Sequence, residues 1–238
     1  IDTETKERLC LADPKSAEII KPILRGRDIK RYSAEWAELW IIATFPALNL
    51  NIDDYPSVKA HLLSFSYDRL EQSGNKYKDF SARKKTGNEW FETQDQIGYW
   101  KEFEKEKIVW LEMSPISNFT IDSDNSIVLN TAYILVSEFI KYIVSVINSK
   151  VIDFYFLTIA TEVRGGTRRY IKQYVEQMPI PKIPEAKQRP FIKLVDKLLS
   201  FKKQNPAADT KYLEAQIDTR VYALYELTAD EIKIIEGT

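Results

Sequence analysis

The stretch that decides the fold is KIVWLE, residues 107–112, in which a β-branched pair, a tryptophan and a leucine stand between a lysine and a glutamate. Short runs rich in β-branched and aromatic residues are typical of buried strands, so we expect a central strand here. Working outward, residues 39–44 predict a second buried strand. Residues 118–121 and 127–136 predict shorter strands, separated by a polar turn at 122–125. Together these segments predict a mixed sheet.

Helices are predicted around these strands. Asp53 or Asp54 is a suitable cap for a helix that has Pro56 in its first turn. Residues 137–148 carry apolar side chains at helical spacing, and residues 151–160 fit either a helix or a strand.

The organisation of the chain changes at residues 178–184, where three prolines predict an extended connector. Beyond it, apolar stripes at helical spacing predict a run of helices. We therefore expect an α+β fold. A polar lead-in at 1–20 precedes a mixed β-sheet domain with flanking helices at 21–184, and a small helical unit follows at 185–238.

The composition excludes several classes of protein. The 238 residues include 44% hydrophobic ones, enough for an ordinary core, and the net charge of −1 gives no general attraction to polyanions. A single cysteine, Cys10, rules out an internal disulfide framework. No uncharged apolar run approaches the ~20 residues that span a bilayer. We expect a soluble, cytoplasmic protein, and because the chain starts at Ile1 we expect it to be part of a longer one.

The most informative polar stretch is VRGGTRRY, residues 163–170. Two adjacent glycines permit positive φ or a close approach to a partner, and guanidinium groups suit phosphate oxygens or the edge of guanine. The alternative is a solvated turn that follows an apolar helix.

Two further basic segments lie at residues 21–32 and 83–85. Three such segments in a neutral chain predict that positive charge gathers on one side, with acidic residues elsewhere. The candidate DNA contacts are Arg25, Arg27, Lys30, Arg31, Arg83, Lys84, Lys85, Arg164, Gly165, Gly166, Thr167, Arg168 and Arg169. Trp90, Trp100 and Trp110 are able to stack on bases, although the strand spacing favours a core position for Trp110.

Catalytic machinery is not expected in this chain. One histidine, His61, and one cysteine cannot make a His/Cys zinc site, and no other metal ligands or catalytic residues are predicted. No glycine-rich phosphate loop is present, so we expect no cofactor here. The E-x-K matches lie in polar or helical surroundings without an acidic partner, which argues against a self-sufficient nuclease or hydrolase.

The order of the segments resembles the TaqI-like C-terminal specificity domain. The resemblance covers nearly all of residues 21–237. It rests on KPILRGRDI (21–29), YPSVKAHL (55–62), KIVW (107–110), LNTAYI (129–134), INSK (147–150), RGGTRRY (164–170), MPIP (178–181), LEAQID (213–218) and VYALY (221–225).

The resemblance implies a target-recognition domain of a type IIG restriction–modification enzyme or an adenine-specific DNA methyltransferase. It implies that a methyltransferase domain upstream in the same chain binds S-adenosylmethionine and holds a flipped adenine with an N-P-P-aromatic motif. Here Asn205 and Pro206 are followed by two alanines, so the motif is missing and this fragment alone should not transfer methyl groups.

The sequence therefore predicts a double-stranded DNA recognition domain without enzyme activity of its own. The 164–169 arginines would enter a groove or clamp the backbone, those of 25–31 would mostly hold phosphates, and 83–85 would lie on a loop that orders on DNA. The alternative is a protein-interaction module that docks a partner through the C-terminal helices. The recognised sequence, the cleavage activity of the parent and the oligomeric state stay open.

Overall fold

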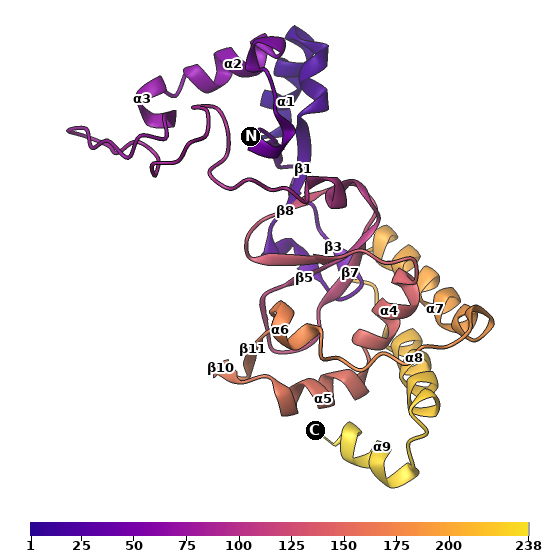
Figure 1. The fold of residues 1–238 in the computed structure, drawn as a ribbon. Helices are drawn as coiled ribbons and strands as arrows, with labels where there is room; N and C mark the ends of the chain where they lie inside the picture. The colour runs from indigo at the N-terminus through magenta and orange to yellow at the C-terminus, as the bar shows by residue number, and fades with distance from the viewer. Residues whose placement is uncertain (238) are drawn as a thin grey trace. The chain divides into compact units, whose positions relative to one another are not determined.

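The computed structural model describes residues 1–237, and their contacts divide them into two compact units (Figure 1). The first unit comprises 1–23, 38–104 and 125–127, and the second comprises 24–37, 105–124 and 128–238. The two units do not follow the boundaries at residues 20 and 184 that the sequence predicts, because each is assembled from segments that are distant along the chain.

The first unit is mostly helical turns and loops. Its helices are α1 (Thr3–Ala12), η1 (Pro14–Glu18), η3 (Pro46–Leu48), η4 (Ile52–Asp54), α2 (Pro56–Leu63), α3 (Tyr67–Leu70) and η5 (Trp100–Glu104). Strand β1 (Ile20–Leu24) pairs antiparallel with β4 (Trp40–Ile42), with Ile20 opposite Ile42. The predicted strand at 39–44 thus exists, but β4 is only half-buried.

The polar lead-in at 1–20 contains α1, which buries Leu9 in a cluster that includes Ile52, Val58 and Phe91. A single buried leucine in a polar helix gives no periodic signal, which is why the sequence does not reveal it. Neither Asp53 nor Asp54 caps α2, because both lie in η4 and Tyr55 occupies the N-cap position.

The second unit is built around the predicted central strand. Strand β5 (Lys107–Leu111) lies between β7 (Phe119–Asp122) and β9 (Ala132–Leu135) in an antiparallel sheet. Ile108 and Val109 are fully buried and Trp110 is 5% exposed, so the prediction for 107–112 is confirmed and Trp110 is a core residue. A buried ion pair joins Lys107 to Asp122 directly across the ladder, with 2.5 Å between Nζ and Oδ2.

Short strands and turns complete the β portion of this unit. They are η2 (Gly26–Asp28), β2 (Ile29–Lys30), β3 (Ser33–Ala34), β6 (Met113–Ser114), β10 (Glu162–Arg164) and β11 (Thr167–Arg169). Strand β8 (Ile127–Val128) contains a boundary between the two units. The small sheets β2–β3 and β10–β11–β6 are both antiparallel.

The second unit also contains helices (Figure 1). They are α4 (Ile140–Ile147), α5 (Lys150–Ile159), α6 (Lys172–Val175), α7 (Glu185–Gln204), α8 (Lys211–Leu224) and α9 (Ala229–Glu236). Helix α4 packs against β5 and β7. The alternative left open for 151–160 resolves as a helix. In α4 the buried residues include Val144 and Val146, and α7 packs against α4 and α8 with Val195 and Leu198 fully buried.

The α+β prediction is confirmed, with flanking helices on a mixed set of small sheets. The C-terminal helices share one hydrophobic core with β5 and β7 rather than forming a separate body. The last helix, α9, begins with a capping box, since Thr228 accepts from the Glu231 backbone and Glu231 accepts from that of Thr228. Within residues 1–237 no single helix is long and apolar enough to cross a membrane, and α4 with α5 would pass that test only as a pair bent by 67°.

Candidate nucleic-acid interface

The paired glycines form the turn of a β-hairpin. Gly165 has a φ of +59° and Gly166 a φ of +78°, and strands β10 and β11 meet there with Arg164 opposite Thr167. Positive φ at both central residues is the requirement of a two-residue type I′ turn, whose twist matches that of the strands it joins. The Gly166 N–H also donates to Glu162 Oε1 at 2.8 Å. The glycines therefore serve the turn, and nothing lies within 4 Å of either built Cβ position.

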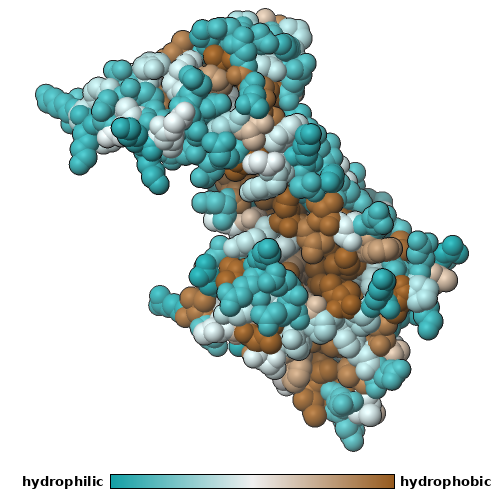
Figure 2. Space-filling model, in the orientation of Figure 1, coloured by the Kyte–Doolittle hydropathy of each residue, from teal (hydrophilic) through white to brown (hydrophobic). Residues whose placement is uncertain are grey.

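The hairpin exposes its outer strand. The side chains of Glu162, Val163 and Arg164 are all exposed, and the pairing with β11 shifts register between Glu162 and Arg164. The hairpin projects from the body of the second unit beside α5 and α6 (Figure 1), and its outer end is hydrophilic (Figure 2). A bulged, charged edge strand resists pairing with another strand and leaves its side chains available to a different kind of partner.

The three hairpin arginines differ in their surroundings. Arg164 is exposed, and no hydrogen bond or ion pair is recorded for its guanidinium among the described residues. Arg168 is half-buried and donates from Nε to the carbonyl of Ala160 at 3.2 Å. Arg169 is half-exposed and donates from Nε and Nη2 to Glu112 Oε1 at 3.0 and 2.5 Å, and these hydrogen bonds to the carboxylate raise the pKa of Arg169.

A second basic turn lies at the same end of β5. Gly26 sits so close to the end of the strand that a Cβ there would lie 2.5 Å from a methyl carbon of Leu111, and it would also crowd Thr131. Glu112, the next residue along, holds Arg169. The η2 turn and the hairpin therefore both border the C-terminal end of the central strand, and they bring residues 25–28 and 164–169 to one region of the unit.

Arg25 shapes this turn instead of facing outward. Its guanidinium forms a two-pronged pair with Asp28, with Nε–Oδ2 at 2.8 Å and Nη2–Oδ1 at 2.6 Å. The Asp28 carboxylate is 5% exposed. Burial acts to raise its pKa, but the hydrogen bonds from Arg25 outweigh burial and leave the pKa of Asp28 lowered. Arg27, between them, is exposed.

Two further predicted residues are held by partners to different degrees. Lys30 is half-exposed and pairs with Glu35 at 2.5 Å. Arg31 is 19% exposed; its Nη1 donates to Asp153 at 3.2 Å and its Nε lies 3.0 Å from Glu214 Oε2. Its Nη2 donates to the carbonyl of Asn148. Arg31 therefore ties β2–β3 to α5 and α8, and we leave it out of the interface.

The 83–85 triplet belongs to the first unit, and its cations also differ in whether other groups of the fold bind them. Arg83 donates to three backbone carbonyls, those of Leu70, Glu92 and Trp90, and burial lowers its pKa. Arg83 therefore holds together the loop that carries it, and the expectation that this loop orders on DNA does not fit these hydrogen bonds. Lys84 and Lys85 are exposed.

These contacts reduce the number of predicted cations that are available to a partner. Carboxylates neutralise Arg25, Lys30, Arg31 and Arg169, and Arg83 is satisfied by carbonyls. Among the predicted cations, those that are exposed and make no ion pair or side-chain hydrogen bond with other described residues are Arg27, Lys84, Lys85 and Arg164. The sequence reasoning missed Glu112 and Asp28 as partners. Asp28 was visible as the fourth residue of RGRD, whereas Glu112 is 57 residues from Arg169 and gave no signal.

Residues 1–237 contain no group of three or more histidine, cysteine, aspartate or glutamate side chains placed to hold a metal ion.

Comparison with known proteins places this geometry in a family. A family model described as the TaqI-like C-terminal specificity domain matches residues 21–180. The type II methyltransferase M.BstVI of Geobacillus stearothermophilus is 24% identical over 241 residues, which cover 97% of this chain and 39% of that protein. The solved structure of the type IIL restriction–modification enzyme MmeI in complex with DNA is similar in fold, with a TM-score of 0.58 at 14% identity.

That structural match covers 96% of this chain and 31% of the MmeI chain, so the chain spans well under half the length of both proteins. The family match covers the η2 turn, the central strand and the whole β10–β11 hairpin. The chain belongs to the family of TaqI-like C-terminal specificity domains.

Proposed function

We propose that this chain recognises a specific sequence in double-stranded DNA. In this proposal it is the recognition part of an adenine-specific DNA methyltransferase or a type IIG-like restriction–modification enzyme. The observation that carries the proposal is the Gly165–Gly166 hairpin, which projects from the unit and carries the exposed Arg164 on one strand and Arg169 on the other. Family membership and the resemblance to two proteins of restriction–modification systems support it.

The hairpin is a two-stranded β-ribbon, and the major groove of B-DNA, which is about 12 Å wide, admits such a ribbon. Arg164 would contact a base edge or a phosphate, and Thr167 and the turn amides would lie against the backbone. Arg168, fixed by the Ala160 carbonyl, would hold the base of the ribbon in place.

Within the hairpin, the guanidinium of Arg169 is held by the Glu112 carboxylate. A carboxylate and a guanine edge both accept two N–H groups from one arginine, so DNA would be able to take over Arg169 from Glu112 with little change in its geometry. Arg27 and Lys30 would contact phosphates on the other side of the end of β5. Such contacts fix register and carry no sequence information.

Lys84 and Lys85 would add phosphate contacts from the first unit. The loop that carries them is held internally by Arg83 and by Gln72, whose side-chain amide donates to the carbonyls of Glu89 and Glu92. These lysines would therefore add affinity from a preformed loop rather than from one that orders on DNA.

The chemistry would come from a methyltransferase domain upstream in the same polypeptide. That domain would bind S-adenosylmethionine and accept an adenine extruded from the duplex, at a cost of a few kcal/mol that the phosphate contacts help to offset. We assign no residue of 1–237 to the cofactor or to methyl transfer.

The alternative, a protein-interaction module, has less support. It requires apolar faces on the C-terminal helices that a partner would cover. The stripes of α7 and α8 are instead buried within the second unit, where Leu194, Leu198, Leu213 and Ile217 are 6% exposed or less.

Binding of a mixed-sequence duplex at several salt concentrations tests the proposal. Each lost phosphate contact should lower the slope of log K against log salt by about 0.9. We expect that decrease for Arg164→Ala if it contacts phosphate, and a loss of about 1–3 kcal/mol restricted to one base position if it reads a base. Lys203→Ala, an exposed cation on α7, is the matched control. A wild-type chain whose affinity for duplex does not respond to salt would remove the proposal.

A further inference from the structure

The first unit contains a small cavity that the hairpin does not use. Its volume is about 140 Å³, and it is lined mainly by apolar surface. Trp100, Phe103 and Glu104 all come from η5, where Trp100 and Phe103 are three residues apart and so lie on one side of this 3-10 turn. Phe45 and Lys21 contribute from the segments around β4 and β1.

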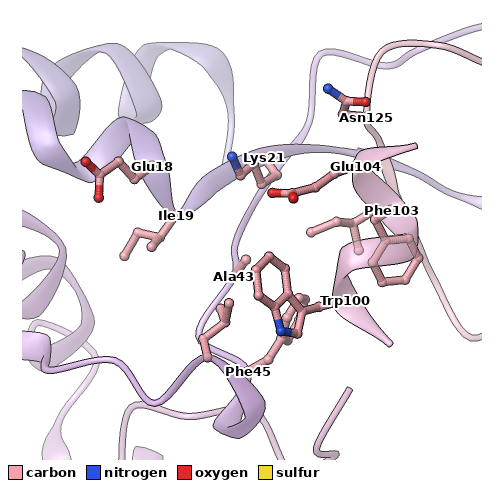
Figure 3. Close-up of a pocket in the computed structure, with 11 residues that line it drawn as sticks. Glu18, Ile19, Lys21, Ala43, Phe45, Trp100, Phe103, Glu104 and Asn125 are labelled. Carbon is pink, nitrogen blue, oxygen red and sulfur yellow. The ribbon is translucent and has the colours of Figure 1, made fainter. Parts of the chain in front are cut away.

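The size of the cavity selects its occupant. A dry cavity of about 150 Å³ in another protein holds a benzene molecule, so this one has room for a single six-membered ring and too little for the fused rings of a purine. Phe45 and Phe103 are 5% and 4% exposed, which fixes two of the walls. In Figure 3 the indole of Trp100 lies between Ile19 and Phe103.

The polar groups of the cavity gather at its rim. Lys21 and Glu104 lie above the indole in Figure 3, with Asn125 beyond them, and Glu18 lies on the other side of Lys21. An ammonium donates hydrogen bonds and a carboxylate accepts them. A ring that presents a carbonyl oxygen together with an N–H or an amino group along one edge would match Lys21 and Glu104 together. Benzene-like rings lack such an edge, whereas every pyrimidine base has one.

We propose that this cavity binds an unpaired pyrimidine base, stacked on Trp100 and hydrogen-bonded at its polar edge by Lys21 and Glu104. The base must be unpaired because in a duplex its pairing edge is occupied and its faces are covered. The cavity therefore takes a base from a single strand or one extruded from a duplex. The proposal extends the proposed function, on which it rests for the source of the base.

Short single strands of oligothymidine, oligodeoxyadenosine and an abasic backbone of equal length test the cavity separately from duplex binding. We expect oligothymidine to bind the full chain more tightly than the other two strands, measured by fluorescence anisotropy at low salt. Stacking on an aromatic side chain is worth about 1–3 kcal/mol per base, so Trp100→Leu should weaken oligothymidine about fivefold to 150-fold. The same substitution should leave the affinity for the abasic strand unchanged.

Glu104→Gln keeps the shape of an exposed side chain and guards against a folding defect in Trp100→Leu. It should weaken the binding of oligothymidine about fivefold, because a neutral amide oxygen replaces a charged acceptor. Phe65→Leu, on an exposed aromatic residue outside the cavity lining, is the control and should bind as the wild type does.

Equal affinity for the three strands, or no effect of either cavity variant, would overturn the assignment. If duplex binding persists with its salt dependence in that case, the proposed function stands and only the cavity assignment fails. If oligothymidine is preferred while duplex does not bind, the cavity assignment stands and the duplex function fails.

Discussion

The Gly165–Gly166 turn gives the sharpest test of how the hairpin works. Both residues have positive φ, and no atom lies within 4 Å of a Cβ at either position. A side chain there meets no clash, so the whole cost of a substitution is the backbone conformation. That cost is about 1–2 kcal/mol for an ordinary residue with left-handed dihedral angles, and more for a β-branched one.

Two substitutions of Gly165 separate conformation from side-chain bulk. Asparagine tolerates positive φ and is favoured in type I′ turns, so Gly165→Asn should keep the hairpin. Valine is similar in size to asparagine, but Gly165→Val should lose the hairpin because a β-branched residue does not tolerate positive φ. Because the hairpin is an exposed edge of the sheet, the cost should appear as local opening, with the melting temperature of the whole chain lowered by no more than about 2–8 °C.

The assay is duplex affinity across a range of salt concentrations. Gly165→Val should weaken binding and lower the salt slope by about the number of hairpin cations that contact phosphate, while Gly165→Asn should match the wild type. Amide hydrogen exchange of residues 162–169 would report the local opening directly. If Gly165→Val opens the hairpin in hydrogen exchange and yet binds duplex with an unchanged slope, the hairpin is not the contact surface and the reasoning fails.

Three further predictions concern the groups that hold the site. Asp28 has a lowered pKa, so its contribution to stability is present above pH 3.8 and is lost as the pH falls through the pKa of the folded state. In urea unfolding, Asp28→Asn should therefore lower the free energy of unfolding by about 2–4 kcal/mol at neutral pH. The variant should also show a weaker dependence of stability on pH in the acid range. Arg31→Met should cost about 3–5 kcal/mol, because it leaves Asp153 without its buried partner, and a changed salt slope of DNA binding would contradict its structural role. Lys107→Met should lower the free energy of unfolding by about 3–5 kcal/mol, because it leaves the buried Asp122 carboxylate without its partner. The double variant with Asp122→Leu should recover most of that loss. A double variant as unstable as the single one would show that the ion pair itself stabilises the fold more than apolar side chains would.

Much of the architecture was predictable because it follows from local patterns. KIVWLE reads as a central strand and is one, since its apolar residues can only be satisfied by burial on both faces. The Gly165–Gly166 pair predicted positive φ, and the structure has it at both positions. The capping box between Thr228 and Glu231 was predictable for the same reason, because its two hydrogen bonds join residues three apart.

The candidate contacts were less predictable because the charge of a side chain does not reveal its partner. RGRDIKR carries four cations and two of them, Arg25 and Arg31, hold the fold together by ion pairs. Arg83 looks like part of a solvated basic triplet, yet three carbonyls enclose its guanidinium. A guanidinium that binds a phosphate and one that clips a loop are identical in the sequence.

The amino-acid sequence by itself determined the central strand, the glycine turn and the C-terminal run of helices, and it identified the family through the order of the segments. Tertiary structure alone decided which arginines remain available. The partners that occupy them lie far along the chain, with Glu112 57 residues from Arg169 and Asp153 122 residues from Arg31. Electrostatic pairing depends on distance in space, and only folding brings such residues within a few ångströms of each other.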